Sequence, residues 1–243
     1  MTTSDDPNAE AAVDKLLTEF AQNKHIARAI HDTAWEYRKL GNYGRANELD
    51  QYVIDHWPAD VQVMWAKMDM AKTDIGLGND AAVEKTIDIL IADFNDKPEL
   101  ATAIFMLGEQ YYNKALTAES EAHFQKAILI WERIIKELPA SGMTAQAYYF
   151  SARCYESVGE YKKAIEYYQV VVDTWPRYEY AWNAQFLIAR CYDKLASSGQ
   201  ILTADAAVQI RRGCDKVLAN YPDCMAVKAA GNLLKRWNSV NPQ

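Results

Sequence analysis

Residues Ala145–Pro176 read AQAYYFSARCYESVGEYKKAIEYYQVVVDTWP, and the rest of the chain repeats this pattern in looser form. Two runs of apolar residues at helical spacing are separated by Gly159 and closed by Pro176. The first run holds Tyr148, Phe150, Ala152 and Tyr155, and the second holds Tyr161, Ala164, Ile165, Tyr168 and Val171. Small Ala152 allows a neighbouring helix to approach closely, so the stretch is predicted to form a helical hairpin.

The same residues resemble a tetratricopeptide repeat. That family has a small residue with an aromatic three later, a glycine turn, an alanine with an aromatic four later, and a closing proline. In this sequence the six places hold Ala152, Tyr155, Gly159, Ala164, Tyr168 and Pro176. The resemblance predicts a solenoid of stacked hairpins.

The pattern recurs along the chain. Ala46 and Ala127 lie as far before Pro58 and Pro139 as Ala164 lies before Pro176. Repeats are predicted at 26–58, 59–98, 99–139, 140–176 and 177–222. The steps between their closing prolines are 40, 41, 37 and 46 residues, each longer than the usual repeat of about 34 residues. The third carries seven extra residues, which either lengthen its helices or widen its turn. The fifth carries nine, with a long turn predicted at Ser197-Ser198-Gly199.

The predicted architecture is all-α, a right-handed solenoid of about five such hairpins. Residues 1–8 are expected to be a disordered lead, and 9–238 a single domain with a helix at each end, about 9–22 and 224–238. The long steps and the fragments VVVDTWP and VLANYP are similar to those of bacterial outer-membrane assembly lipoproteins. The sequence as given shows no lipoprotein signal with its cysteine at the start, so an envelope role is not the first expectation.

Charge and composition exclude several classes of function. The 243 residues carry a formal net charge of -7, which argues against nucleic-acid binding because phosphates require a basic surface. The sequence contains no run of about 20 apolar residues that could span a membrane, and its polar N-terminus does not resemble a secretion signal. The sequence as given predicts a cytoplasmic location, with a periplasmic or other envelope compartment as the alternative if it was trimmed.

Catalytic and metal-binding motifs are not found in the sequence. The four histidines form no HExxH motif, and the chain has no GxSxG motif or Walker loop. Cys154 and Cys191 occupy matching places in successive repeats, about a helix spacing apart, which is too far for a disulfide. We therefore expect no enzyme, no metal, no cofactor, and buried free thiols.

The resemblance implies that the first helix of each repeat lines a concave groove. Side chains flanking the small residue would face this groove and bind a peptide or helix of a partner protein. In this sequence they are Arg28, His31, Trp35, Arg38, Trp65, Met68, Lys72, Phe105, Glu109, Tyr112, Gln146, Tyr149, Arg153, Asn183, Phe186 and Arg190.

Arg153 and Arg190 follow Ala152 and Ala189, so the two guanidinium groups are expected to line one groove and bind a carboxylate. The alternative is that they pair with Glu156 and Asp193 on their own helices. The predicted function is a protein-interaction scaffold that binds a partner protein or peptide. The alternatives are a structural module that self-associates or builds a larger assembly, and a pocket for a small molecule or lipid.

Overall fold

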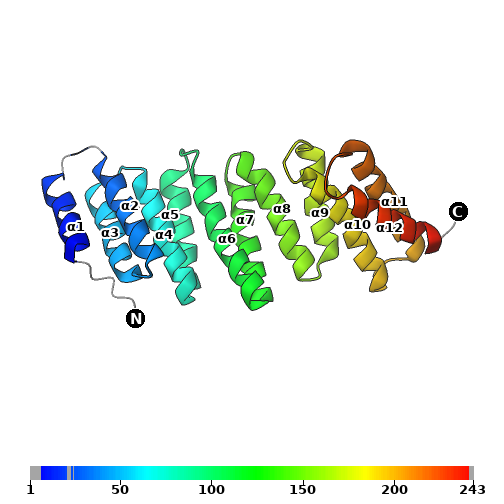
Figure 1. The fold of residues 1–243 in the computed structure, drawn as a ribbon, viewed down its shortest axis with the longest axis horizontal. Coiled ribbons are helices and arrows are strands. Elements are labelled where there is room, and N and C mark those ends of the chain that lie inside the picture. Colours follow the sequence, from blue (N-terminus) through cyan, green and yellow to red (C-terminus); the bar gives the residue numbers. More distant parts are fainter. Residues whose placement is uncertain (1–6, 21–22, 24, 241–243) are drawn as a thin grey trace. The chain divides into compact units, whose positions relative to one another are not determined.

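The computed structural model describes residues 7–20, 23 and 25–240, and these residues form helices joined by short turns (Figure 1). No β-strand occurs among the residues described. The helices are α1 (Pro7–Glu19), α2 (Ile26–Lys39), α3 (Tyr43–His56), α4 (Gln62–Leu77), α5 (Asp80–Phe94), α6 (Leu100–Ala118), α7 (Glu121–Glu137), α8 (Gly142–Ser157), α9 (Tyr161–Thr174), α10 (Ala181–Ser197), α11 (Thr203–Asn220) and α12 (Val227–Val240). The predicted all-α, helical-repeat fold is confirmed.

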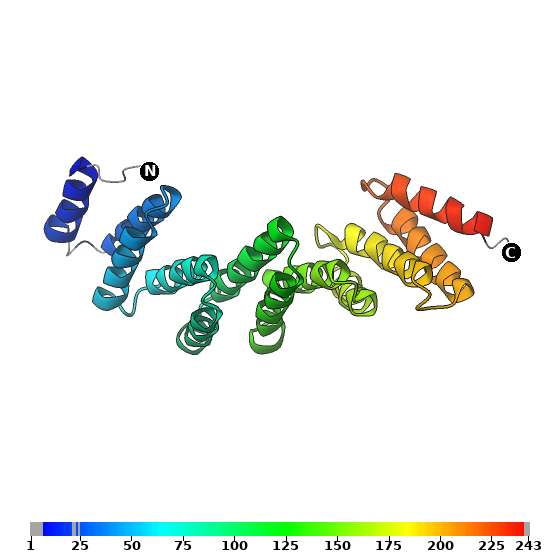
Figure 2. The same cartoon turned by 90° about the horizontal axis from the view of Figure 1, so that it is seen from below.

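The chain divides into two compact units, residues 1–107 and 108–243. In unit 1, α2 packs on α3, α3 on α4, and α4 on α5, with α1 against α2. In unit 2, the same order runs from α7 to α12, each helix packing on the next (Figure 2). Each unit is thus a stack in which a helix contacts its neighbours in sequence, as in helical repeats.

The terminal helices differ slightly from the sequence prediction. Helix α1 begins at Pro7, where a proline suits the first turn because its missing N–H needs no partner. The last two residues of the predicted lead, Pro7 and Asn8, are therefore helical, whereas residues 1–6 lie outside the described part of the chain. Helix α12 begins at Val227, three residues after its predicted start.

Four hairpin turns use a glycine in the left-handed region. Gly41, Gly78, Gly159 and Gly199 have φ of 79, 78, 79 and 70°. After Gly159, the N–H of Glu160 donates to the carbonyl of Tyr155 at 2.9 Å, which satisfies a carbonyl at the helix end. In the turn between α6 and α7, the residue in the left-handed region is Glu119, with φ 48°.

The extra residues of the third and fifth repeats lengthen helices. Helices α6 and α7 have 19 and 17 residues, whereas α8 and α9 of the fourth repeat have 16 and 14. In the fifth repeat, α10 and α11 have 17 and 18 residues. Of the two options that the sequence left open for the third repeat, longer helices account for most of the added chain.

Two glycines of unit 2 lie at close contacts between helices. A Cβ at Gly108 of α6 would collide with the indole of Trp131 on α7, which is fully buried. A Cβ at Gly213 of α11 would lie 3.0 Å from that of Ala189 on α10. Glycine at these positions lets each helix pair approach closely.

Three of the four cysteines, Cys154, Cys191 and Cys214, are buried, Cys224 is half-buried, and all four are free thiols. Burial raises the pKa of the Cys154 and Cys191 thiols well above the ordinary value. These thiols therefore act as small apolar groups in the core. No helix in the described part of the chain has the length and apolar character needed to cross a bilayer.

Candidate functional site

A polar pocket in unit 2 lies between α8 and α10, next to the start of α9. We call it the α8–α10 pocket, and it has a volume of about 310 Å³. Its lining residues are Arg153, Glu156, Ser157, Tyr161, Asn183, Leu187, Arg190 and Lys194. Two arginines and a lysine thus face one carboxylate, which gives the pocket a net positive charge in an acidic protein.

The local sequence explains why Arg153 and Arg190 come together. Each follows an alanine, Ala152 or Ala189, that is fully buried in the helix packing. Helices α8 and α10 both pack on α9, so corresponding positions on them face the same side of unit 2. The expectation that these two guanidinium groups share a surface agrees with this geometry.

Arg153 is half-buried and is surrounded by tyrosines. Burial opposes its positive charge, but the hydroxyls of Tyr112, Tyr149 and Tyr168 outweigh burial, so the pKa of Arg153 is raised. Within the described residues, no carboxylate forms an ion pair with Arg153. The Arg153 guanidinium is therefore held in place by neutral groups and keeps its charge available to a ligand.

Arg190 is more exposed, and it pairs with Glu156 across helices rather than within its own. Its Nη2 lies 3.5 Å from Oε1 of Glu156, and 46% of the Arg190 side chain is exposed. Ion pairs of such exposure contribute little to stability. Asp193, the expected partner of Arg190, instead accepts hydrogen bonds from Arg236 and from the indole of Trp237 at 2.8 Å. The predicted same-helix pair of Arg190 is wrong because α12 packs over Asp193.

Buried tyrosines contact the residues that line the α8–α10 pocket and hold them in place. Tyr149, only 2% exposed, stacks on Tyr180 with ring centroids 5.1 Å apart. Its hydroxyl accepts a hydrogen bond of 2.6 Å from the side-chain amide of Asn183. The Tyr168 hydroxyl donates to Glu156 at 3.2 Å. Tyr149 is therefore part of the support of the site, whereas the sequence predicted that it faces the groove.

Other predicted groove residues of unit 2 lie apart from the pocket. Tyr112 is buried and contacts the ring of Phe124 edge-on, with centroids 5.8 Å apart. Phe186 packs against the buried cluster of α11 and α12. Gln146 is half-buried on α8, and Glu109 is exposed on α6. The structure brings none of these four residues into the lining of the α8–α10 pocket.

In unit 1, two of the predicted groove residues, His31 and Arg38, belong to an internal polar cluster. His31 Nδ1 lies 2.8 Å from Oδ1 of Asp50, and Arg38 Nη1 lies 2.6 Å from Oδ2 of the same carboxylate. Asp50 is fully buried, and Asp69 lies 3.7 Å from the other ring nitrogen of His31. His31 and Arg38 thus join α2 to α3 and α4 instead of facing an open groove.

The remaining predicted residues of unit 1 are divided between surface and core. Arg28 is exposed and pairs with Asp32 at 3.6 Å. Trp35 is 44% exposed, and the Lys72 ammonium lies 5.9 Å from its ring centroid. Of the other three, Trp65 is half-buried, and Met68 and Phe105 are buried.

Several residues of these sites were missed from the sequence. Asp50 falls on the apolar face of α3 between Leu49 and Val53, and a charged residue at such a position signals a buried ion pair. Lys194, four residues after Arg190, lies on the same helix face and lines the pocket. Among the described residues, no group of His, Cys, Asp and Glu is arranged to hold a metal ion.

Comparisons with known proteins agree with this fold. The tetratricopeptide repeat family matches residues 146–178. The crystal structure of MamA aligns with a TM-score of 0.50 and 20% identity over 84% of this chain and 95% of that chain. At this identity the likeness shows the fold alone. A thermophilic repeat protein of Thermus thermophilus aligns at 18% identity and a TM-score of 0.40, covering 88% and 97% of the two chains.

The C-terminal part of a repeat-containing protein from Cytophaga hutchinsonii aligns at 16% identity and a TM-score of 0.48, covering 97% of this chain and 92% of that one. No curated protein sequence matches this chain significantly.

Proposed function

From the premise that this chain is a helical-repeat protein of the tetratricopeptide type, we propose that it is a non-enzymatic interaction scaffold. Its α8–α10 pocket binds an acidic side chain on an extended or helical segment of a partner protein. The observation that carries this proposal is the gathering of Arg153, Arg190 and Lys194 around a single carboxylate, Glu156.

The charges of the pocket favour an anionic ligand. Arg153 has no carboxylate partner in the described part of the chain, and its planar guanidinium can donate two parallel hydrogen bonds to a carboxylate. Lys194 adds a flexible ammonium at the side of Arg190. An acidic side chain entering the pocket would therefore gain charge-assisted hydrogen bonds from at least two helices.

The surroundings of the pocket favour a site formed in advance. The contact between Asn183 and Tyr149 joins α10 to α8, and Tyr149 itself is locked by stacking on Tyr180. Preorganised side chains lose little entropy when a ligand binds. A volume of about 310 Å³ suits one or two side chains rather than a whole folded partner, so the rest of the segment would lie along α8 and α10.

Glu156 sets the selectivity in this proposal. Its carboxylate accepts from Tyr168 and lies near Arg190, so it holds that arginine at the pocket in the free protein. A ligand carboxylate would compete with Glu156 for Arg190, whereas a cationic ligand would meet three like charges. The pocket thus favours acidic over basic segments.

Affinity capture from an extract of the source cells tests the proposal. The bait is the intact chain, the Arg153→Ala/Arg190→Ala variant, or an Arg177→Ala/Lys162→Ala control that removes two exposed cations of unit 2 outside the pocket. We expect one set of proteins to be captured by the first and third baits and lost with the second. Capture of the same proteins by all three baits would remove the pocket from the function.

A direct measurement then identifies the chemistry. Peptides tiling the captured protein are labelled with a fluorophore, and their binding to the chain is followed by anisotropy. The binding peptide should lose at least about tenfold in affinity when its acidic residues are changed to the amides, consistent with loss of a charge-assisted contact. Glu156→Gln should strengthen binding, because it releases Arg190 without emptying the pocket.

A further inference from the structure

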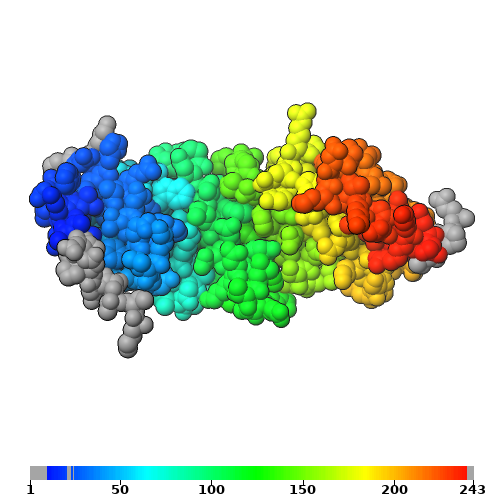
Figure 3. All heavy atoms as spheres, viewed as in Figure 1, coloured from blue at the N-terminus to red at the C-terminus, as the bar shows by residue number. Residues whose placement is uncertain are grey.

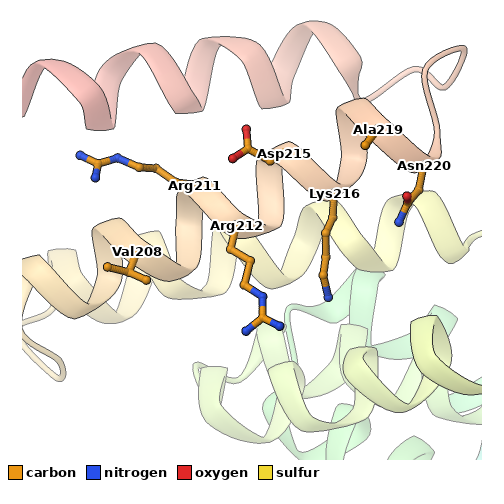
Figure 4. A pocket seen from close by; sticks show the side chains of 7 residues that line it. All are labelled: Val208, Arg211, Arg212, Asp215, Lys216, Ala219 and Asn220. Carbon is orange, nitrogen blue, oxygen red and sulfur yellow. The ribbon is translucent and has the colours of Figure 1, made fainter. Parts of the chain in front are cut away.

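Helix α11 carries a row of exposed or half-buried side chains that is separate from the α8–α10 pocket. Val208, Arg212, Lys216 and Asn220 follow one another every four residues and so lie on one face of the helix. We call them the α11 row. They line a shallow hollow of about 560 Å³ together with Arg211, Asp215 and Ala219 (Figure 4). Arg212 and Lys216 extend to the same side of the helix.

The spacing of the two cations of the α11 row does not favour their own helix. Arg212 and Lys216 are like charges four residues apart, a spacing that destabilises a helix slightly. Within the described residues, neither forms an ion pair. Val208, at the start of the row, is 59% exposed. In the space-filling view, α11 and α12 (orange to red) lie at the surface of unit 2 (Figure 3).

The charge of the chain is divided unequally between its two units. Unit 1 contains 19 Asp and Glu against 10 Lys and Arg, whereas unit 2 contains 14 against 16. A net charge of -7 for the whole chain therefore conceals an acidic half and a weakly basic half. Opposite net charge on the two units favours association of one copy with the next through unlike surfaces.

A row of carboxylates on unit 1 has the same spacing as the α11 row. Asp80, Glu84 and Asp88 on α5 lie four residues apart, and Glu84 and Asp88 are exposed. We call them the α5 row. Two helices laid side by side with matched four-residue spacing bring successive unlike charges into register. The Arg212 guanidinium and the Lys216 ammonium would then each meet one carboxylate of the α5 row.

We propose that the α11 row of one copy of this chain binds the α5 row of a second copy. The two surfaces are different, so each copy retains one of each after pairing, and association continues into an open series or closes into a ring. This assembly does not depend on the α8–α10 pocket, which lies on other helices. A partner segment in the pocket and a neighbouring copy on α11 would bind the same chain together.

Sedimentation velocity of the full chain tests this assembly. Over a hundredfold range of protein concentration in about 0.05 M salt, we expect the weight-average mass to rise to about twice the monomer mass or more. In about 0.5 M salt the mass should return to that of the monomer, because salt screens exposed charges. A chain that stays monomeric in low salt overturns the proposal, even if α11 captures some other acidic protein.

Charge reversal identifies the two surfaces. Arg212→Glu/Lys216→Glu and, separately, Glu84→Lys/Asp88→Lys should each abolish the rise in mass. The matched control Lys228→Glu/Lys235→Glu reverses two exposed cations of α12 outside the row and should associate as the unchanged chain does. Circular dichroism of each variant checks that the helices remain formed.

Combining the four reversals in one chain decides whether the rows meet each other. The acidic α11 row of one copy then faces the basic α5 row of the next, so this chain should regain the association that each variant lost alone. Recovery supports direct pairing. Failure to recover, or association that persists in the Arg212→Glu/Lys216→Glu variant, overturns it.

Discussion

The hydroxyl of Tyr149 accepts a hydrogen bond of 2.6 Å from the side-chain amide of Asn183, and this contact joins α8 to α10 beneath the α8–α10 pocket. The same hydroxyl lies next to Arg153 and contributes to keeping that guanidinium charged. One phenol thus connects the support of the pocket to its most enclosed cation. The position of Arg153 depends on a residue that a ligand does not reach.

Tyr149→Phe should therefore weaken ligand binding without unfolding the chain. Loss of the hydroxyl leaves Asn183 and Arg153 each without one partner, which costs about 1 kcal/mol in stability. We expect a several-fold loss of affinity for the acidic peptide, measured by anisotropy. Tyr148→Phe, on the neighbouring half-buried tyrosine, is the control and should leave affinity unchanged.

Asp50→Asn should destabilise unit 1 strongly. Asp50 is fully buried and contacts both Arg38 and His31, so its neutralisation leaves the buried Arg38 guanidinium without a counter-charge. Breaking a buried pair from one side costs about 3 kcal/mol. Urea unfolding followed by circular dichroism gives the free energy. The exposed Asp55→Asn serves as control, and an equal effect of both variants would contradict the role of the buried cluster.

Gly108→Ala should lower the stability of unit 2. The added Cβ would collide with the indole of the fully buried Trp131, so α6 and α7 must separate. Overpacking of this kind costs about 1–3 kcal/mol. At Gly76 of α4 nothing lies within 4 Å of an added Cβ, so Gly76→Ala should be neutral or stabilising. Thermal unfolding of the two variants side by side measures the difference.

Protonation of Glu132 should make unit 2 less stable in acid. Burial opposes the charge of this α7 carboxylate, but Lys136, Tyr167 and Tyr155 outweigh burial, and the pKa of Glu132 falls below its ordinary value of 4.5. Because the folded pKa is lower than the unfolded one, the stabilisation is complete above about pH 4.5 and disappears as the pH falls through the folded value. Glu132→Gln should flatten this part of the stability curve.

Urea unfolding between pH 6 and pH 3 measures that curve. Glu137→Gln, on a more exposed carboxylate of the same helix, should retain the slope of the unchanged chain. Parallel curves for Glu132→Gln and the unchanged chain would rule out a coupling of Glu132 protonation to folding.

The periodic pattern predicted the helices because it depends on local spacing. The run from Tyr148 to Pro176 gave a hairpin with a turn at Gly159, and the structure has α8, α9 and a left-handed Gly159 in those places. Pro58 and Pro176 predicted helix ends, since the residue before a proline avoids the helical region. Helices α3 and α9 indeed end at His56 and Thr174, with Trp57 and Trp175 as their C-cap residues.

The candidate site was predicted in part. Arg153 and Arg190 were found because they hold equivalent places beside buried alanines, and equivalence between repeats can be read along the chain. Whether Lys194 and Glu156 line the pocket depends on which face each helix presents. Tyr149 was expected to face the groove, but it is only 2% exposed. A residue's burial depends on neighbours that are distant in sequence.

By itself the sequence determined the helical pairs, their turns and the equivalence of Arg153 with Arg190, because spacing, glycine and proline act over a few residues. Only the tertiary structure decided that His31 and Arg38 turn inward to Asp50, that Asp193 is taken by α12, and that Arg190 reaches across to Glu156. The physical reason is that a buried charge must find a counter-charge wherever packing supplies one, and packing joins residues that the sequence keeps far apart.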